Sequence, residues 1–126
     1  MGVGLVPFYE PQVSQEAQYN GDGKGLVVEF AALNEIAVAA DLRPLSDFAA
    51  NEFEACADDT EPPELTYHPI REGLPVVEGL LRAIRSKASV AEKLTDAEYT
   101  LEELEELARS FRAAEAEGVR FCLVFM

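Results

Sequence analysis

The C-terminal stretch Val119-Arg120-Phe121-Cys122-Leu123-Val124-Phe125-Met126 decides the fold. From Phe121 onward every residue is apolar, which indicates a strand buried on both faces, because a strand with one wet face alternates between apolar and polar residues. The other apolar strand, residues 3–8, lies at the opposite end of the chain. We predict that these two strands pair in a small sheet. Since a two-stranded sheet is marginal alone, helices must cover it, and residues 65–70 are a candidate third strand.

Between the two strands, apolar residues recur at helical spacing in about four segments. These are residues 26–40, 45–56, 75–87 and a last helix that begins near Thr100 and ends at Gly118. Thr100 and Glu103 match a capping box, and Pro75 suits the first turn of its helix. Gly118 supplies the left-handed residue that ends the last helix. We therefore expect one α+β domain, residues 1–126, with about four helices packed on the sheet.

The charge balance is strongly acidic, with 10 Lys and Arg residues against 24 Asp and Glu residues, a net charge of −14 and a pI near 4.3. Such a chain repels polyanions, so we expect neither nucleic acid nor an anionic membrane surface as a partner. No apolar run reaches the ~18 residues that span a bilayer, and the N-terminus lacks the pattern of a secretory signal. Cys56 and Cys122 are expected to be reduced thiols, which predicts a cytoplasmic protein.

The acids concentrate between Pro44 and Ile70, where seven of them occur without one Lys or Arg. They are Asp47, Glu52, Glu54, Asp58, Asp59, Glu61 and Glu64. Because such a field steers association with cationic proteins, we predict a non-enzymatic binding module that docks a basic protein partner. Its contact residues are expected to be Asp58, Asp59, Glu61 and Glu64. Small acidic inhibitors of nucleases and immunity proteins against bacterial toxins are similar in size and charge, but this sequence contains no motif of either class. Alternatively, the negative charge serves solubility alone.

A second hypothesis is a small-molecule or divalent-metal site near His68, with an enzymatic role as one version of it. His68 is the single histidine and follows the acidic run, so carboxylates and one imidazole could hold a divalent cation. General base catalysis needs a neighbour that orients the ring, and the sequence identifies none. We therefore expect His68 to be a structural or surface residue, and we predict no cofactor.

The segment Asn20-Gly21-Asp22-Gly23-Lys24-Gly25 has the spacing of half a calcium loop and the glycines of a phosphate loop. Lys24 and Ala31 occupy two positions where a calcium loop needs oxygen ligands, and no P-loop or dinucleotide spacing is present. We instead predict a Gly-rich turn into a helix that Asp22 caps. Five glutamates of the last helix are expected to form a solvated acidic face: Glu98, Glu102, Glu103, Glu105 and Glu106.

Self-association is a separate hypothesis. A free apolar tail is an aggregation hazard, so residues 121–126 need a cover. A homodimer could supply it through this segment, or could form through an exposed helix face.

Overall fold

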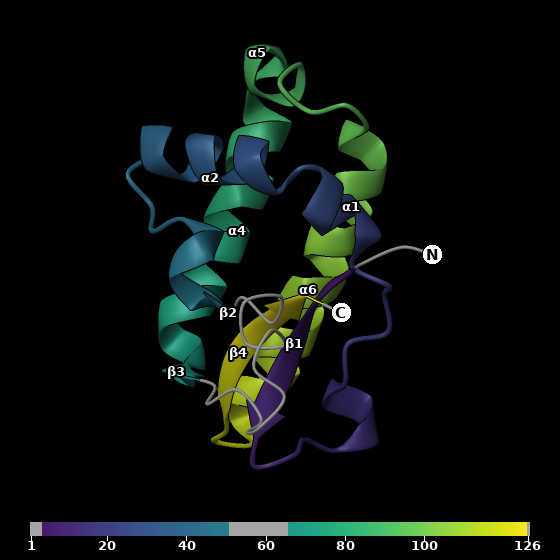
Figure 1. Cartoon of the computed structure of the whole chain (residues 1–126), viewed down its shortest axis with the longest axis vertical. Helices are drawn as coiled ribbons and strands as arrows, with labels where there is room; N and C mark the ends of the chain where they lie inside the picture. Colours follow the sequence, from purple (N-terminus) through teal and green to yellow (C-terminus); the bar gives the residue numbers. More distant parts are fainter. Residues whose placement is uncertain (1–3, 51–65, 126) are drawn as a thin grey trace, which may run out of the picture.

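The structure is a computed structural model that describes residues 4–50 and 66–125. Two long strands lie in front of one long helix, and shorter helices gather at one end of the molecule (Figure 1). In chain order the elements are β1 Leu5–Glu10, η1 Gln15–Ala17, α1 Lys24–Val28, α2 Phe30–Ala39, η2 Leu45–Phe48, β2 Ala49–Ala50, β3 His68–Pro69, α4 Ile70–Ser86, α5 Ala88–Ala91, α6 Ala97–Ala116 and β4 Arg120–Phe125. Helices packed on a small sheet that contains both terminal strands are an α+β fold, as predicted.

The two ends of the chain pair as expected. β1 runs antiparallel to β4, in a register that places Leu5 opposite Phe125 and Glu10 opposite Arg120. The second edge of β4 is shared by two very short strands. Of these, β2 pairs in parallel through Ala49 and Leu123, and β3 pairs antiparallel through His68 and Phe121. The predicted third strand near residues 65–70 is therefore present as the two residues of β3.

The strand β4 is buried on both faces, because Phe121, Cys122, Leu123 and Val124 are each at most 1% exposed. Phe121 and Leu123 belong to the main hydrophobic core, and the alternation of a strand turns Cys122 and Val124 to the other face. The chain thus covers this stretch itself. A homodimer, through residues 121–126 or through an exposed helix face, stays a prediction.

The helices α4 and α6 pack against each other and against the sheet, and together they supply most of the core. At its centre the rings of Phe111 and Phe121 lie 4.6 Å apart between centroids. Gly73 of α4 lets the helix approach this point, because a Cβ atom there would collide with the Phe121 ring. In residues 4–50 and 66–125, no helix combines the length and the apolar character needed to cross a membrane.

The helix predicted over residues 26–40 is present, but it is divided into α1 and α2 at Glu29. The backbone of Glu29 leaves the helical region (φ −99°, ψ 11°), and its side chain is only 4% exposed. Its Oε2 atom accepts a hydrogen bond of 3.0 Å from the backbone N–H of Asp96, just before α6. A contact 67 residues away along the chain therefore coincides with the break, and helical periodicity cannot report such a contact.

The helix predicted over residues 45–56 is wrong in its first half, and its second half lies outside the described residues. Residues 45–48 form the 3₁₀ helix η2, and Ala49 continues as β2 against β4. The Phe48 ring is buried 5.1 Å from the His68 ring and 5.3 Å from the Phe121 ring, centroid to centroid. The open edge of β4 and this ring cluster therefore outweigh the local helical preference.

Two helix starts also differ from the prediction. α4 begins at Ile70, five residues before Pro75, so the proline lies in the second turn and the apolar residues before it reach the core. α6 begins at Ala97 with Asp96 as its N-cap, and Asp96 accepts a bond from the backbone N–H of Tyr99. The capping box predicted at Thr100 is therefore wrong. Gly118 has the expected positive φ of 70° just after α6.

Candidate functional site

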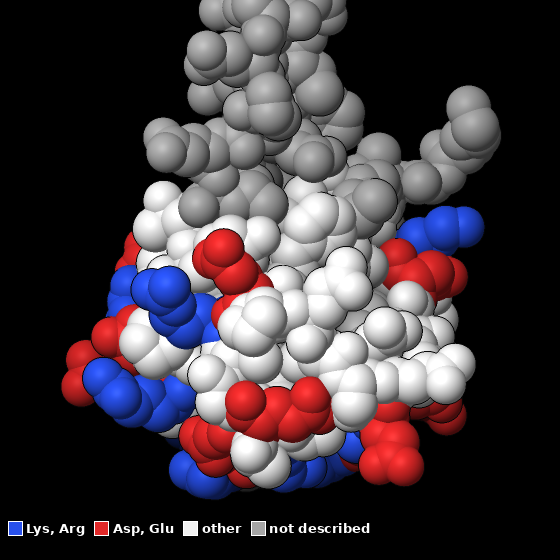
Figure 2. All heavy atoms as spheres, turned by 90° about the horizontal axis from the view of Figure 1, so that it is seen from below, with Lys and Arg blue, Asp and Glu red and all other residues white. Residues whose placement is uncertain are grey.

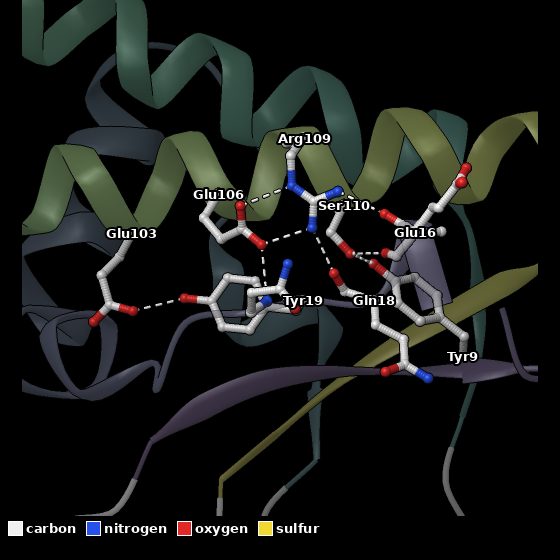
Figure 3. A network of polar contacts seen from close by, with 10 residues as sticks. Tyr9, Glu16, Gln18, Tyr19, Glu103, Glu106, Arg109 and Ser110 are labelled. Atoms are coloured by element: carbon white, nitrogen blue, oxygen red, sulfur yellow. Dashed lines mark hydrogen bonds and ion pairs between the residues drawn. The ribbon is translucent and has the colours of Figure 1, made fainter. Parts of the chain in front are cut away.

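The segment between η1 and α1 lies along one face of α6 and is held there by polar side chains of that helix (Figure 3). Its centre is the carboxylate of Glu103, which is 5% exposed. Glu103 accepts three hydrogen bonds, from the Tyr19 hydroxyl at 2.6 Å, the Gly23 N–H at 2.8 Å and the Gly25 N–H at 2.7 Å. The Gly-rich turn therefore does bind an anion, and that anion is a carboxylate of the same chain.

This cradle excludes the other ligands considered for residues 20–25. The amide protons that would hold a phosphate already point to Glu103. A Cβ atom at Gly25 would collide with the ring of Tyr99 and crowd the carboxylate of Glu103, so a side chain does not fit there. The prediction that Asp22 is the N-cap is wrong, because Gly23 occupies that position. The Oδ1 atom of Asp22 instead accepts from the N–H of Lys24 just before the helix. The loop is thus a structural joint between α1 and α6.

A second set of bonds fixes the segment further along α6 through Arg109 and Glu106. Arg109 donates to the carbonyl oxygens of Glu16 and Gln18 at 2.7 and 2.5 Å, and it pairs with Glu106 at 2.7 Å. Glu106 also accepts from the backbone N–H of Asn20 at 2.8 Å. Its pKa is lowered, chiefly by the hydrogen bond from Arg109. Glu103 and Glu106 therefore do not belong to the solvated acidic face predicted for this helix.

The third anchor joins α6 to the sheet. Ser110 is fully buried and donates its hydroxyl proton to the Ala17 carbonyl at 2.6 Å. Since a serine hydroxyl carries one proton, the 2.5 Å contact between Ser110 and Tyr9 requires the Tyr9 hydroxyl to donate. Burial raises the pKa of Tyr9 to about 12, and burial together with the bond to Glu103 also raises the pKa of Tyr19. Both phenols therefore stay protonated near neutral pH, and the network binds rather than transfers protons.

The polar face of α6 was missed in the sequence because its partners are distant. Its members follow one side of the helix at helical spacing and are Tyr99, Glu103, Glu106, Ser110 and Glu117. One local signal was available in the sequence. Ser110 lies among the apolar positions Leu107, Ala108 and Phe111, and not among the charged positions that face solvent. A buried polar residue of this kind must find a partner.

The site residues named from the sequence are only partly visible. Asp58, Asp59, Glu61 and Glu64 lie outside the described residues, so the structure does not test them. His68 is half-buried in β3, with its ring 5.1 Å from that of Phe48 and 6.0 Å from that of Phe121. Within residues 4–50 and 66–125 no group of three His, Cys, Asp or Glu side chains is placed to hold a metal ion. Because the acids of the loop are not among these residues, the metal hypothesis at His68 stays a prediction.

A groove of about 550 Å³ runs beside β1 and is lined by Tyr9, Tyr19 and Tyr67 together with apolar residues of the strand. The free edge of β1 offers little to an added strand. Leu5 already donates its N–H to the Gly23 carbonyl, and alternate residues of an antiparallel strand face the same edge. Pro7 therefore lies at a position that faces this edge, and it has no backbone N–H to donate to an added strand.

The most partner-like surface lies where α1 meets the start of α6. We call it the α1–α6 acidic surface and define it by Asp22, Val28, Asp96, Glu98, Tyr99 and Glu102. Its four carboxylates are exposed, as are Val28 (72%) and Tyr99 (38%). The Tyr99 hydroxyl donates to Asp22 at 2.9 Å, and this bond raises the pKa of Tyr99 to about 12. The pKa of Asp22 is lowered, first by the hydrogen bond from the Lys24 N–H and then by the bond from Tyr99. Four exposed acids and two exposed apolar groups thus share the region where α1 meets α6, with Lys24 as an exposed cation beside Asp22.

No protein-family model matches this sequence, and neither a curated protein nor a solved structure matches it significantly.

Proposed function

We propose that this protein is a small, non-enzymatic binding module that docks a basic protein partner. The observation that carries the proposal is the excess of exposed acids over the cation Lys24, together with exposed apolar groups, on the α1–α6 acidic surface. Aromatic side chains are effective anchors at protein interfaces, and surrounding carboxylates speed the encounter with a cation and select for it. The acidic loop residues Asp58, Asp59, Glu61 and Glu64 are included as a second contact region on the strength of the sequence.

The distribution of charge favours this surface over others. All ten Lys and Arg residues of the chain lie in the described segments, and Arg43, Arg85, Arg109 and Arg112 are each engaged in ion pairs with carboxylates. The face seen in Figure 2 accordingly shows Lys and Arg side chains interspersed with Asp and Glu around uncharged surface. A face with both signs of charge attracts neither cationic nor anionic partners strongly. The excess of acids at the start of α6 therefore makes that region the better docking surface for a basic partner.

The same proposal assigns the protein to the cytoplasm. It rests on the sequence alone, because a chain with two cysteines has little capacity for a disulfide framework.

The test uses three variant sets and one purified partner. Proteins captured by the immobilised chain are identified, and a basic candidate is then purified and its Kd measured at low and high salt. The α6 set is Glu98→Gln, Tyr99→Ala and Glu102→Gln; the loop set neutralises Asp58, Asp59, Glu61 and Glu64. A matched control, Glu35→Gln with Glu92→Gln and Glu115→Gln, removes exposed acids elsewhere.

We expect the α6 set to weaken binding at least tenfold and the control to change it less than twofold, with affinity falling as salt rises. Loss with the loop set alone would move the interface to the loop while keeping a basic partner. Binding that ignores salt and all three sets, or the absence of any specific basic partner, would leave solubility as the role of the charge and would refute the proposal.

A further inference from the structure

A second groove, formed by α2, α4 and α5, carries the opposite charge to the rest of the molecule. Its volume is about 360 Å³, within the ~300–1,000 Å³ typical of small-molecule sites. Arg82, Lys87 and Lys93 stand on its rim. Its floor is largely apolar and includes Ile36, Leu42, Ala83 and Val90. We call this the cation-rimmed groove.

Acids are in large excess over bases in this chain, 24 against 10, yet six of the ten Lys and Arg residues form no ion pair in the part of the chain that the structure describes, and three of these six line this groove. Elsewhere Arg43, Arg85, Arg109 and Arg112 find carboxylate partners. Among the described residues, in contrast, neither Arg82, Lys87 nor Lys93 forms an ion pair, and no Asp or Glu lines the groove. Three like charges gathered without a counter-ion repel one another, so an anion placed between them would relieve that repulsion.

The floor adds a second requirement to the ligand. Leu42 is half-buried and packs closely on Gly79 of α4, where a side chain would displace it. Ala83 and Val90 are half-buried on the other walls, so an aliphatic body lying here would remove apolar surface from water. A small inorganic anion would leave this surface wet, and a neutral hydrocarbon would leave the cations without a partner.

We propose that the cation-rimmed groove binds a small amphipathic anion, namely a free carboxylate carried on an aliphatic chain. Arg82, Lys87 and Lys93 hold the carboxylate, and the chain lies on the apolar floor between α2 and α4. The site is separate from the α1–α6 acidic surface and does not depend on a protein partner. Its ligand and the proposed basic partner differ in charge, so one proposal can fail while the other stands.

The experiment titrates the full-length protein with decanoate below its micelle concentration. Binding is measured by calorimetry and mapped by amide chemical shifts. Decyltrimethylammonium and acetate serve as comparisons, one with the chain but the wrong charge and the other with the charge but no chain. We expect saturable decanoate binding, shifts confined to residues 36–42 and 79–93, and at least tenfold weaker binding of both comparisons.

Two variants test the two halves of the site. The rim variant combines three substitutions: Arg82→Gln, Lys87→Gln and Lys93→Gln. Because each exposed cation contributes about a few-fold to the affinity for the carboxylate, their joint loss should weaken decanoate binding about tenfold. Ala83→Leu fills the floor and keeps the charge. The control Lys24→Gln with Arg71→Gln and Arg120→Gln loses the same charge elsewhere and should bind decanoate normally.

Failure of decanoate to bind, shifts outside the groove, or equal affinity for decyltrimethylammonium would overturn the assignment. So would a rim variant that binds as tightly as the control. Because the three substituted cations are exposed, the rim variant should stay folded, and its far-ultraviolet circular dichroism checks this.

Discussion

Replacement of Glu103 by Gln is the most informative single change in this protein, because it alters charge and hydrogen bonding with almost no change of shape. In the structure three donors converge on the carboxylate: the Tyr19 hydroxyl, the Gly23 N–H and the Gly25 N–H. Oε2 receives two of them and Oε1 receives one. An amide keeps only one acceptor oxygen, so at least one buried donor must then face an NH₂ group.

The expected loss follows from this count. If the amide oxygen retains Tyr19 and Gly23, the Gly25 N–H loses its acceptor, and an unsatisfied buried donor costs about 1–3 kcal/mol. We therefore expect Glu103→Gln to lower the free energy of unfolding by about 2 kcal/mol, or Tm by about 7 °C in a domain of this size. Glu103→Ala removes all three acceptor contacts and should cost about 4 kcal/mol.

The assay is urea unfolding followed by circular dichroism at 25 °C, with Glu102→Gln as the control. Glu102 is the exposed neighbour of Glu103 on the same helix, so its variant should stay within about 0.5 kcal/mol of the natural protein. If Glu103→Gln were as stable as Glu102→Gln, the carboxylate would not hold the Gly-rich turn, and α1 would not be joined to α6 through Glu103.

Three further predictions follow from the same contacts. Gly23 and Gly118 share a φ near 70°, but a Cβ at Gly118 meets nothing within 4 Å, whereas one at Gly23 collides with the backbone of Leu5; Gly118→Ala should cost about 1 kcal/mol in urea unfolding and Gly23→Ala several times more, and equal losses would contradict this reasoning. Glu29→Ala leaves the half-buried N–H of Asp96 without its acceptor and should lower stability by about 1 kcal/mol, while Glu29→Gln, which retains an acceptor, should lose less than half of that. The pKa of Glu106 is depressed in the folded state, so its contribution is present above the ordinary glutamate pKa and is lost as the pH falls through the lower folded value; below about pH 5 the Tm of Glu106→Gln should therefore fall less steeply than that of the natural protein, and parallel acid limbs would exclude this role.

The pairing of the chain ends could be predicted because it depends on composition alone. Residues 121–124 are too apolar to face water, and one other apolar strand was available near the N-terminus. The short strands β2 and β3 were harder to predict, since two residues carry no periodicity. Ala49 becomes extended because β4 has an open edge beside it, which is a property of the assembled sheet and not of the local sequence.

The Gly-rich turn shows a different limit of prediction. Its glycines are also typical of an anion-binding loop, an interpretation set aside in favour of a plain turn, and spacing does not say which anion such amides would hold. Glu103 lies about eighty residues further along the chain, and in the sequence it also completed a convincing capping box with Thr100. The structure resolves the competition, because Asp96 caps α6 and thereby releases Glu103 to the turn. A motif with two acceptable partners can be assigned only when distances are known.

These internal uses of carboxylates change what the net charge of −14 implies for binding. Glu29 and Glu103 are buried against backbone amides, and Glu106 and Glu117 hold the segment along α6. Their neutralisation would weaken a complex only by loosening the fold, so it should lower Tm and affinity together. Neutralisation of Glu98 and Glu102, which are exposed, should instead lower affinity at unchanged Tm. The relation between Tm and Kd across such variants therefore separates structural acids from recognition acids, which net charge alone cannot do.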